Sequence, residues 1–416
     1  MINKQYFEIQ ELVEAIIDNR GKTVPTSENG IPLIATNCIK HSSIFPTFEN
    51  IRYINQETYD NWFRAHLKPN DILFVNKGTP GRCCIVPNPV NFVAAQDMVG
   101  LRFKKHLNPY YMLAVLRSKE IQNTIENNHV GLVIAHFRKK ELVKLKLPIL
   151  EETIRNKIGD FYEIISKKIE LNNRINAELE AMAKTLYDYW FVQFDFPNEE
   201  ANPYKSSGGK MVYNETLKRE IPKGWEVKKL EEIEEKIVTG KTPSTKVSEY
   251  FNGNIPFITI DDIRKQFYVY NAERNLTILG AESQANKYVY SGDICVSCIG
   301  TIGIIGIVAT TSQTNQQINT ISQIKDYNRY FLLNSLKNYF EYNVGAKKGA
   351  VLDNMNKQEF SNIPILDANR NLKKLYFDKV NPIYEKIKLN LKQNQELSAL
   401  RDWLLPMLMN GQVKVG

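Results

Sequence analysis

Two identical triplets offer side chains suited to binding a phosphate group. Gly21-Lys22-Thr23 recurs as Gly240-Lys241-Thr242. A nucleotide-binding P-loop needs another glycine five residues earlier, because that glycine lets backbone N–H groups wrap the phosphates. That place holds isoleucine in the first copy and glutamate in the second. We therefore expect no ATP binding. We predict instead a turn whose lysine, Lys22 or Lys241, reaches a phosphate or only solvent, with Thr23 or Thr242 beside it.

A second motif, Gly-Thr-x-Gly, also occurs twice, at Gly78–Gly81 and Gly300–Gly303. Its glycines permit a tight hairpin. They would equally let the backbone approach DNA, with neighbouring basic side chains on guanine or phosphate. The candidate contacts are Lys77, Thr79 and Arg82 in the first copy and Thr301 in the second. The second copy carries Ile299 and Ile304 in place of both basic residues. Any base contact there must come from elsewhere.

Gln96 and Gln316 fall at nearly equivalent places in the two copies. A glutamine pairs with adenine through two hydrogen bonds, so each is a candidate for reading a base. The alternative is a buried amide that only supports the fold. The sequence leaves both interpretations open.

Catalytic and metal-binding patterns are not found. The five histidines form no HExxH motif and no triad. Cys295 and Cys298 form a CxxC, but a zinc site would need a second pair. Their surroundings, GDICVSCIG, indicate a buried strand rather than a redox site. We expect a chain that is not an enzyme by itself and holds no metal or cofactor.

The whole chain is a duplication. Asn70–Val86 aligns without gaps on Gly292–Val308, and Gly30–Ile39 matches Asn254–Ile263. Each copy begins with about 150 residues of short β-branched and aromatic runs broken by Gly, Pro and Asn, which are typical of strands and turns. A long helical stretch follows in each copy. The pattern predicts an α+β fold with pseudo-two-fold symmetry. The expected parts are globular domains over 1–150 and 220–366, long helices over 151–195 and 367–416, and a flexible polar linker over 196–219.

The two helical stretches carry a seven-residue apolar repeat, which indicates an antiparallel coiled coil. The alternative is that each helix packs only on its own domain. The predicted seam residues are Ile165, Asn172 and Leu179 in the first helix and Ile383, Asn390 and Leu397 in the second. The second heptad position is assigned to Phe161, Ile175, Met182 and Tyr189 in the first helix and to Leu400 and Met407 in the second. The matched Asn172 and Asn390 suggest residues that fix the register of the helix pair.

Aromatic and apolar side chains gather at the ends of both helices, beyond what a single seam uses. They either pack on the neighbouring domain or anchor another subunit. The candidate anchors are Tyr187, Trp190 and Phe191 in the first helix and Trp403, Leu404 and Leu405 in the second.

Composition and charge set broad limits. Hydrophobic residues make up 43% and charged residues 24%, an ordinary globular balance. No apolar run has the roughly 18 residues that a membrane span needs, and the N-terminus does not resemble a secretory signal. We expect a cytoplasmic protein. The net charge of +8 suits a polyanionic partner as well as many unrelated proteins.

At this point the sequence resembles the specificity subunits of type I restriction-modification systems, over nearly its whole length. The likeness depends on the duplicated plan, the GDI…GT.G block (Gly292–Gly303), the GKTP turn (Gly240–Pro243), the IP.I strand starts and the LYDYWF helix end (Leu186–Phe191). The first copy departs from the pattern, because Val24 follows its GKT triplet.

The resemblance implies two target-recognition domains that each read one half of a bipartite sequence in double-stranded DNA. The helices would set the unread spacer and dock two modification subunits. Those subunits would bind S-adenosylmethionine and methylate adenine, while restriction subunits would use ATP and magnesium. The rival hypothesis is a non-catalytic protein–protein scaffold with duplicated modules, which predicts no sequence-specific DNA binding.

Overall fold

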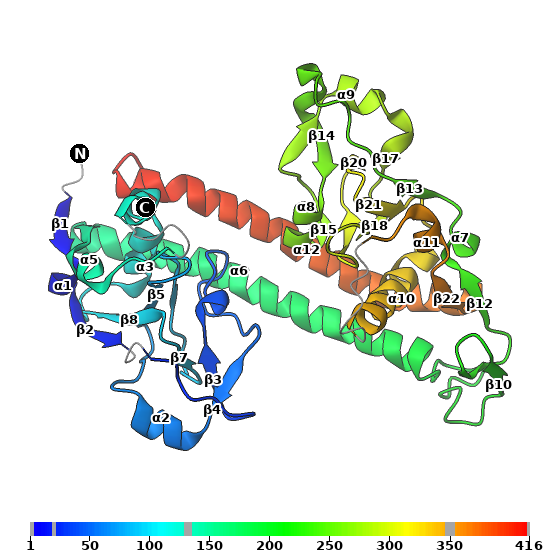
Figure 1. Cartoon of the computed structure of the whole chain (residues 1–416), viewed down its shortest axis with the longest axis horizontal. Coiled ribbons are helices and arrows are strands. Elements are labelled where there is room, and N and C mark those ends of the chain that lie inside the picture. The colour runs from blue at the N-terminus through cyan, green and yellow to red at the C-terminus, as the bar shows by residue number, and fades with distance from the viewer. Residues whose placement is uncertain (1–3, 19–21, 129–134, 346–353, 414–416) are drawn as a thin grey trace. The chain divides into compact units, whose positions relative to one another are not determined.

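The computed structural model describes residues 4–18, 22–128, 135–345 and 354–413. Two compact units divide the chain: unit 1 comprises Met1–Arg174 with Lys392–Gly416, and unit 2 comprises Ile175–Leu391. Each unit therefore contains one strand-rich half of the duplication and a part of both long helices (Figure 1).

The strands of unit 1 that the structure describes form three sheets, with orders β2-β8-β5-β6, β4-β3-β7 and β1-β9. The strands are β1 (Gln5–Glu8), β2 (Val13–Asp18), β3 (Ile31–Ile34), β4 (Arg52–Ile54), β5 (Ile72–Val75), β6 (Cys83–Ile85), β7 (Val93–Ala94), β8 (Met98–Phe103) and β9 (Lys146–Ile149). The short helices are α1 (Ile9–Leu12), α2 (Gln56–Trp62), α3 (Pro109–Arg117), α4 (Lys119–Asn128) and α5 (Lys139–Lys144), with a 3₁₀ turn at Thr36–Cys38.

Local sequence explains these elements. Strand β5 reads ILFV and all four residues are buried, as expected for a central strand covered on both faces. Helix α3 starts where the Asn108 side chain accepts hydrogen bonds from the N–H groups of Tyr110 and Tyr111. Pro109 occupies its first turn, where no intrahelical N–H partner is lost.

Unit 2 repeats the plan. Its described strands form sheets with orders β13-β21-β18-β19-β15, β16-β14-β20-β17, β12-β22 and β10-β11. The strands are β10 (Met211–Asn214), β11 (Arg219–Pro222), β12 (Glu226–Lys229), β13 (Ile237–Thr239), β14 (Phe251–Ile258), β15 (Tyr268–Val269), β16 (Arg274–Leu276), β17 (Tyr288–Val289), β18 (Ile294–Ser297), β19 (Ile305–Val308), β20 (Ser312–Thr314), β21 (Ile318–Ile321) and β22 (Pro364–Asp367). The shorter helices are α7 (Leu230–Ile233), α8 (Ile260–Lys265), α9 (Ile278–Glu282), α10 (Asp326–Gly345) and α11 (Lys357–Ser361), with 3₁₀ turns at Ser248–Tyr250 and Ala285–Lys287.

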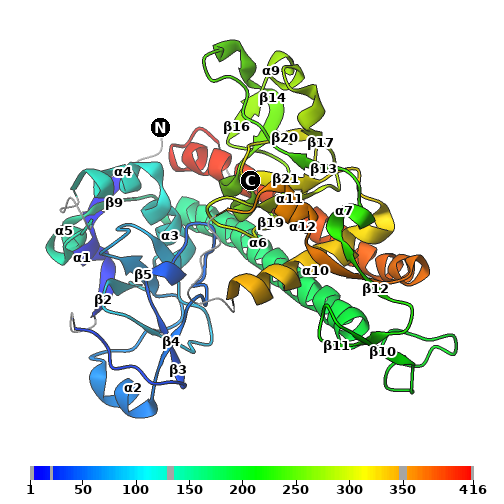
Figure 2. The ribbon, with the colours of Figure 1, turned by 45° about the vertical axis from the view of Figure 1, so that its right-hand side comes forward.

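The two long helices are α6 (Glu152–Tyr187), continued by a π-helical turn at Asp188–Val192, and α12 (Arg370–Met409). At 1.5 Å per residue they are about 54 and 60 Å long. They pack against each other, and both views show them side by side (Figures 1 and 2). The expectation of an α+β fold with two long paired helices is confirmed.

Contacts inside each unit show that the helix pair is antiparallel. In unit 1, Arg401 lies over the Tyr162 ring, with its guanidinium carbon 5.9 Å from the ring centroid, and Asn172 bonds to Asn394. In unit 2, the Tyr376 hydroxyl donates to the Ala183 carbonyl, and Asn390 bonds to Asn176. In both units the residue numbers rise along one helix as they fall along the other.

The helix pair uses a different second heptad position from the one that we predicted. Of the residues predicted there, Met182, Tyr189 and Leu400 are exposed, and Phe161, Ile175 and Met407 are half-buried. The residues four positions after the predicted seam residues Ile165, Asn172, Leu179, Ile383 and Asn390 are buried instead. They are Ile169, Asn176 and Ala183 in α6 and Ile387 and Asn394 in α12. Of the six predicted seam residues, Ile165, Asn172 and Asn390 are buried, and Leu179, Ile383 and Leu397 are half-buried.

Asparagines meet asparagines between the helices. Asn172 Nδ2 donates to Asn394 Oδ1 at 2.8 Å in unit 1, and Asn390 Nδ2 donates to Asn176 Oδ1 at 2.8 Å in unit 2. The duplication makes these two contacts equivalent, because Asn172 corresponds to Asn390 and Asn176 to Asn394. Buried amides without such partners would be costly, so each contact favours this register of the helices over its alternatives.

The segment predicted as a flexible linker is folded. The Asp195 carboxylate accepts hydrogen bonds from the backbone N–H and the hydroxyl of Ser206, each at 2.7 Å. Phe196 stacks between Tyr204 and Trp225. The β10–β11 hairpin follows and lies beyond the end of α6 (Figure 2). Polar composition led to the prediction of flexibility, but the aromatic side chains Phe196 and Trp225 join this segment to the core of unit 2.

Candidate nucleic-acid interface

Three turns meet at one end of the largest sheet of unit 2. Strands β13 and β18 finish there, and β19 and β21 begin there, because each of these neighbours is antiparallel. The Gly240–Thr242, Gly300–Gly303 and Asn315–Gln317 turns therefore lie together. The Thr242 hydroxyl donates to Gln316 Oε1 at 2.6 Å, and the backbone N–H of Cys298 donates to the Gln317 carbonyl at 2.7 Å. Four predicted site residues, Lys241, Thr242, Thr301 and Gln316, thus share one end of the sheet.

Unit 1 brings two of the corresponding turns together at the end of its β2-β8-β5-β6 sheet. Strands β2 and β5 finish where β6 and β8 begin. The backbone N–H groups of Asn76 and Lys77 donate to the Asp97 carbonyl, next to Gln96. The other predicted residues of this copy are exposed Lys22, Thr23 and Lys77 and half-buried Thr79 and Arg82. Gly21, the first residue of the GKT triplet, lies outside the described residues.

Electrostatics near the first turn depend on two arginines. Arg117 donates hydrogen bonds to the carbonyls of Ser43 and Cys83, which ties the chain around His41 to the β6 strand. Burial lowers the pKa of His41, and the nearby guanidiniums of Arg117 and Arg82 lower it further. His41 is therefore neutral at pH 7, and the positive charge beside this turn comes from Lys77, Arg82 and the Arg117 guanidinium.

The glycines of the two Gly-Thr-x-Gly turns adopt backbone conformations that other residues rarely take. Gly78 and Gly300 have φ of +89° and +77°, and Gly81 and Gly303 have φ of +91° and +86°. A Cβ added at Gly78 or Gly300 would meet nothing within 4 Å, whereas at Gly303 it would lie 2.8 Å from the Phe340 ring. The second glycine is therefore needed for packing. The first has open space before it, which leaves room for a close partner.

The two glutamines differ in exposure. Gln316 is exposed and held by Thr242, so its amide group is oriented and accessible. Gln96 is half-buried, and its Oε1 atom is buried without a hydrogen-bond partner among the described residues. Gln316 therefore fits the base-reading alternative. Gln96 fits the structural alternative only in part, because a structural amide would have a hydrogen-bond partner for its Oε1 atom.

The turns, the sheets and the helix pair match a known family. The family model described as type I restriction modification DNA specificity domain matches residues 1–181 and 222–399, one match for each copy of the duplication. The chain belongs to this family. It is the DNA specificity subunit of a type I restriction-modification system, a component that carries no catalysis of its own.

Relatives of this specificity subunit agree with the assignment. It is 32% identical over 318 residues to the type I restriction enzyme HindI specificity subunit of Haemophilus influenzae, covering 65% of this chain and 69% of the relative. It is 24% identical over 352 residues to the MjaIX specificity subunit of Methanocaldococcus jannaschii, covering 83% and 78%. The fold resembles the crystal structure of the M. genitalium type I S subunit, with a TM-score of 0.54 at 16% identity over 98% of this chain and 96% of that one.

The aspartates of the duplicated block are structural. Asp71 is buried in unit 1 and pairs with Arg102 at 2.8 Å. Its counterpart Asp293 is buried in unit 2 and forms no such pair with another described residue. It accepts hydrogen bonds from two backbone N–H groups and the Ser322 hydroxyl. Burial raises the pKa of Asp293, and these hydrogen bonds oppose the rise. Both residues lie before the strands β5 and β18, away from the turns at the other end.

Most of the predicted partner anchors lie inside the specificity subunit. Tyr187, Trp190 and Phe191 are buried in the core of unit 2, where Phe191 packs on Trp225 and Tyr376. This arrangement matches the alternative of packing on the neighbouring domain. Of the predicted anchors in the second helix, Leu405 is buried, Leu404 is half-buried and Trp403 is 60% exposed. Trp403 alone of these six lies fully at the surface.

The long helices expose a different set of apolar side chains. In unit 1 these include Leu171 and Leu400, and in unit 2 their counterparts Leu389 and Met182. Their exposed fractions range from 40% to 59%. Each unit thus presents one leucine from one helix and a leucine or methionine from the other, at matching positions of the duplication.

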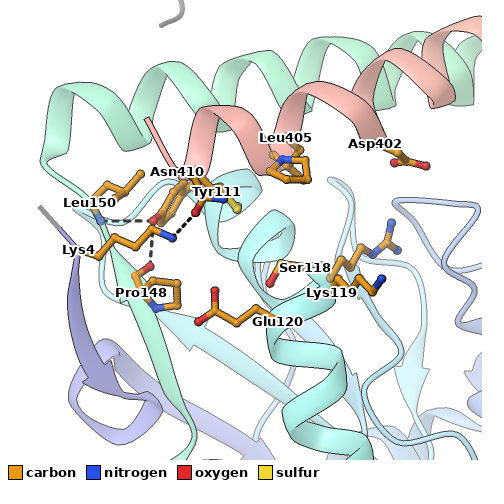
Figure 3. A pocket seen from close by; sticks show the side chains of 13 residues that line it. Lys4, Tyr111, Ser118, Lys119, Glu120, Pro148, Leu150, Asp402, Leu405 and Asn410 are labelled. Carbon is orange, nitrogen blue, oxygen red and sulfur yellow. Dashed lines mark hydrogen bonds between the residues drawn. The ribbon is translucent and has the colours of Figure 1, made fainter. Parts of the chain in front are cut away.

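A cavity of about 450 Å³ lies in unit 1 between α3, α4 and the end of α12 (Figure 3). Tyr111 and Lys4 line it, and the Lys4 ammonium donates to Asn410 Oδ1 at 2.6 Å. In the duplication Lys4 corresponds to Trp225, and Met409 to Phe191. The smaller side chains of unit 1 leave a hollow where unit 2 packs aromatic rings.

The CxxC pair is buried, as predicted. Burial raises the pKa of Cys295 to about 12 and that of Cys298 to about 11, so both thiols stay protonated and unreactive. No group of three or more His, Cys, Asp or Glu residues in the described part of the chain could hold a metal ion. Among the same residues, no helix is long and apolar enough to cross a membrane.

Proposed function

We propose that each unit reads one half of a bipartite DNA target through the three turns at the end of its main sheet. The observation that supports this most is the gathering of the predicted residues. Lys241, Thr242, Thr301 and Gln316 share one sheet end in unit 2, and Lys77, Arg82 and Gln96 lie at the corresponding end in unit 1. By analogy with Lys241 and Thr242, we assign Lys22 and Thr23 to this end as well. Lysines would hold phosphates and fix the register, while a few side chains read base edges.

The paired helices would act as a ruler for the unread spacer. The asparagine contacts hold one register, and helices of this length span more than one turn of DNA, which is about 34 Å. The spacer would then follow from helix length.

The modification subunits would dock on the exposed apolar residues of the helix pair. Leu171 and Leu400 in unit 1 repeat as Leu389 and Met182 in unit 2, which supports two equivalent sites and hence two subunits. S-adenosylmethionine would be held by these partners, and ATP and magnesium by restriction subunits. A complex acting on chromosomal DNA works in the cytoplasm, the location predicted from the sequence. Family membership leaves the scaffold hypothesis without support.

The test is detection of N6-methyladenine by single-molecule sequencing in a host that expresses this chain with and without its cognate modification subunit. A bipartite methylated motif that requires both proteins is the expected result. Co-purification of the two proteins without any methylated motif would contradict the proposed reading of DNA.

A further inference from the structure

The second Gly-Thr-x-Gly turn lacks the basic side chains of the first. Ile299 and Ile304 stand where unit 1 has Lys77 and Arg82. Isoleucine offers no hydrogen bond to a base, so a guanine contact at this turn needs a donor from another element.

The structure brings such a donor to the turn. Arg264, the fifth residue of α8, donates from Nη2 to the Thr301 hydroxyl at 3.3 Å. Its Nη1 donates to Asp261 Oδ1 at 2.5 Å, three residues earlier on the same helix. The Arg264 side chain is 52% exposed, so the guanidinium is held in place and accessible at once.

Helix α8 is itself firmly positioned. Asp262 is buried, and its carboxylate accepts hydrogen bonds from the backbone N–H and the hydroxyl of Thr259. The other carboxylate oxygen accepts from the N–H of Glu273. A side chain that projects from a fixed helix and is braced by two contacts loses little conformational entropy on binding.

Unit 1 uses the equivalent position differently. Alignment of Gly30–Ile39 with Asn254–Ile263 places Lys40 where unit 2 has Arg264. Lys40 forms an ion pair with Glu49 rather than with the turn. Unit 1 keeps its basic residues on the turn, and unit 2 supplies one from α8.

We propose that Arg264 reads a guanine in the half-site recognised by unit 2. An arginine has five N–H donors in a planar fork, and Asp261 and Thr301 use two of them. The remaining donors suffice for the paired contact to O6 and N7 of guanine. The inference rests on the proposed function and names the residue and the base that the second turn uses.

The experiment uses the complex of this chain with its modification subunit and compares wild type with Arg264→Lys. Lysine keeps the charge and loses the paired contact. We expect the methylated motif to lose its preference for guanine at one position of one half-site, with the other half-site unchanged. The ratio of the affinity for DNA with guanine at that position to the affinity for DNA with adenine there should be about tenfold smaller in the variant than in wild type.

Two further variants sharpen the result. Asp261→Asn leaves the arginine in place without its ionic brace, so guanine should remain preferred with a smaller margin. Arg329→Lys is the matched control, because Arg329 pairs with Asp326 at the same spacing but hydrogen-bonds to Gly292, which precedes β18 at the other end of the sheet. It should leave the motif unchanged.

Equal weakening on all sequences with an unchanged motif would show a phosphate contact and overturn the proposal. An Arg264→Lys complex indistinguishable from wild type would overturn it as well. Failure of the proposed function itself looks different, because the wild-type complex would then give no bipartite motif.

Discussion

At the scale of single residues, Gly300 separates two explanations for the Gly-Thr-x-Gly motif. Its φ of +77° is expected if the glycine is needed only for a tight hairpin, whereas the open space around it is expected if DNA approaches the backbone. Asparagine tolerates this left-handed backbone conformation better than other residues that carry a side chain. Gly300→Asn should therefore cost less than about 1 kcal/mol of stability. If DNA approaches the turn, the added side chain should weaken specific binding at least tenfold, as measured by titration with target DNA.

Gly224→Asn is the control for that prediction. Gly224 also lies in unit 2, has φ of +89° and has open space around it, but it belongs to a turn before β12. Unchanged DNA affinity in Gly300→Asn would return the motif to a purely structural role.

At the scale of elements, Asn172 and Asn394 should behave as a coupled pair. Asn172→Leu leaves the Asn394 carbonyl oxygen without its donor in a buried position, and should cost about 1 to 3 kcal/mol. The double variant Asn172→Leu, Asn394→Leu removes both amides and should recover much of that loss. Urea unfolding of the four proteins measures the coupling. Costs that simply add would show that the two amides act independently.

A second prediction at this scale concerns docking on the helices. Met182→Glu with Leu389→Glu places charge on the exposed apolar residues of unit 2 and should cost little stability, because both side chains are more than half exposed. We expect the assembled complex to retain one modification subunit instead of two, as measured by native mass spectrometry. Tyr213→Glu, at an equally exposed site in the β10–β11 hairpin, should retain both. Loss of both subunits would contradict two equivalent sites.

The helices also show how far sequence reasoning reaches. The seven-residue repeat predicted two long packed helices, and the matched asparagines were found from it. The second seam position was misplaced by one residue, because Met182 and Leu400 are apolar yet exposed, while the polar Asn176 and Asn394 are buried. The repeat placed Asn172 and Asn390 in the seam, but it did not reveal that their partners Asn394 and Asn176 are buried there as well.

The turns show the same limit. The duplication predicted which turns matter, since matched glycines mark matched backbone. Arg264 was missed because it lies about 40 residues from Thr301 in sequence, and nothing in a sequence indicates that α8 and the turn meet. Trp190 and Phe191 were candidates for an interface because they are large and apolar. They are buried by contacts with Trp225 and Tyr376, which belong to other segments of the chain.

At the scale of the whole molecule, duplication makes the two recognition functions separable. Unit 1 and unit 2 share their sheet and turn plan but differ at the turn residues, as Lys77 and Ile299 illustrate. Exchange of residues 1–150 for the equivalent domain of another specificity subunit should therefore change one half-site and leave the other. Sequencing of methylated adenines checks this result. A change in both half-sites would contradict independent reading.

The length of the helix pair should determine the number of base pairs in the unread spacer. One heptad inserted into each helix, between Arg174 and Ile175 and between Leu391 and Lys392, preserves the seam and falls where one unit ends and the next begins along the chain. Seven residues add about 10 Å of helix, which equals about three base pairs of DNA. The methylated motif should keep both half-sites and gain about three base pairs of spacer. Four inserted residues in each helix serve as a control, because they rotate the asparagine contacts out of the seam and should abolish methylation. An unchanged spacer after the heptad insertion would show that the helices hold the domains without measuring the distance between their half-sites.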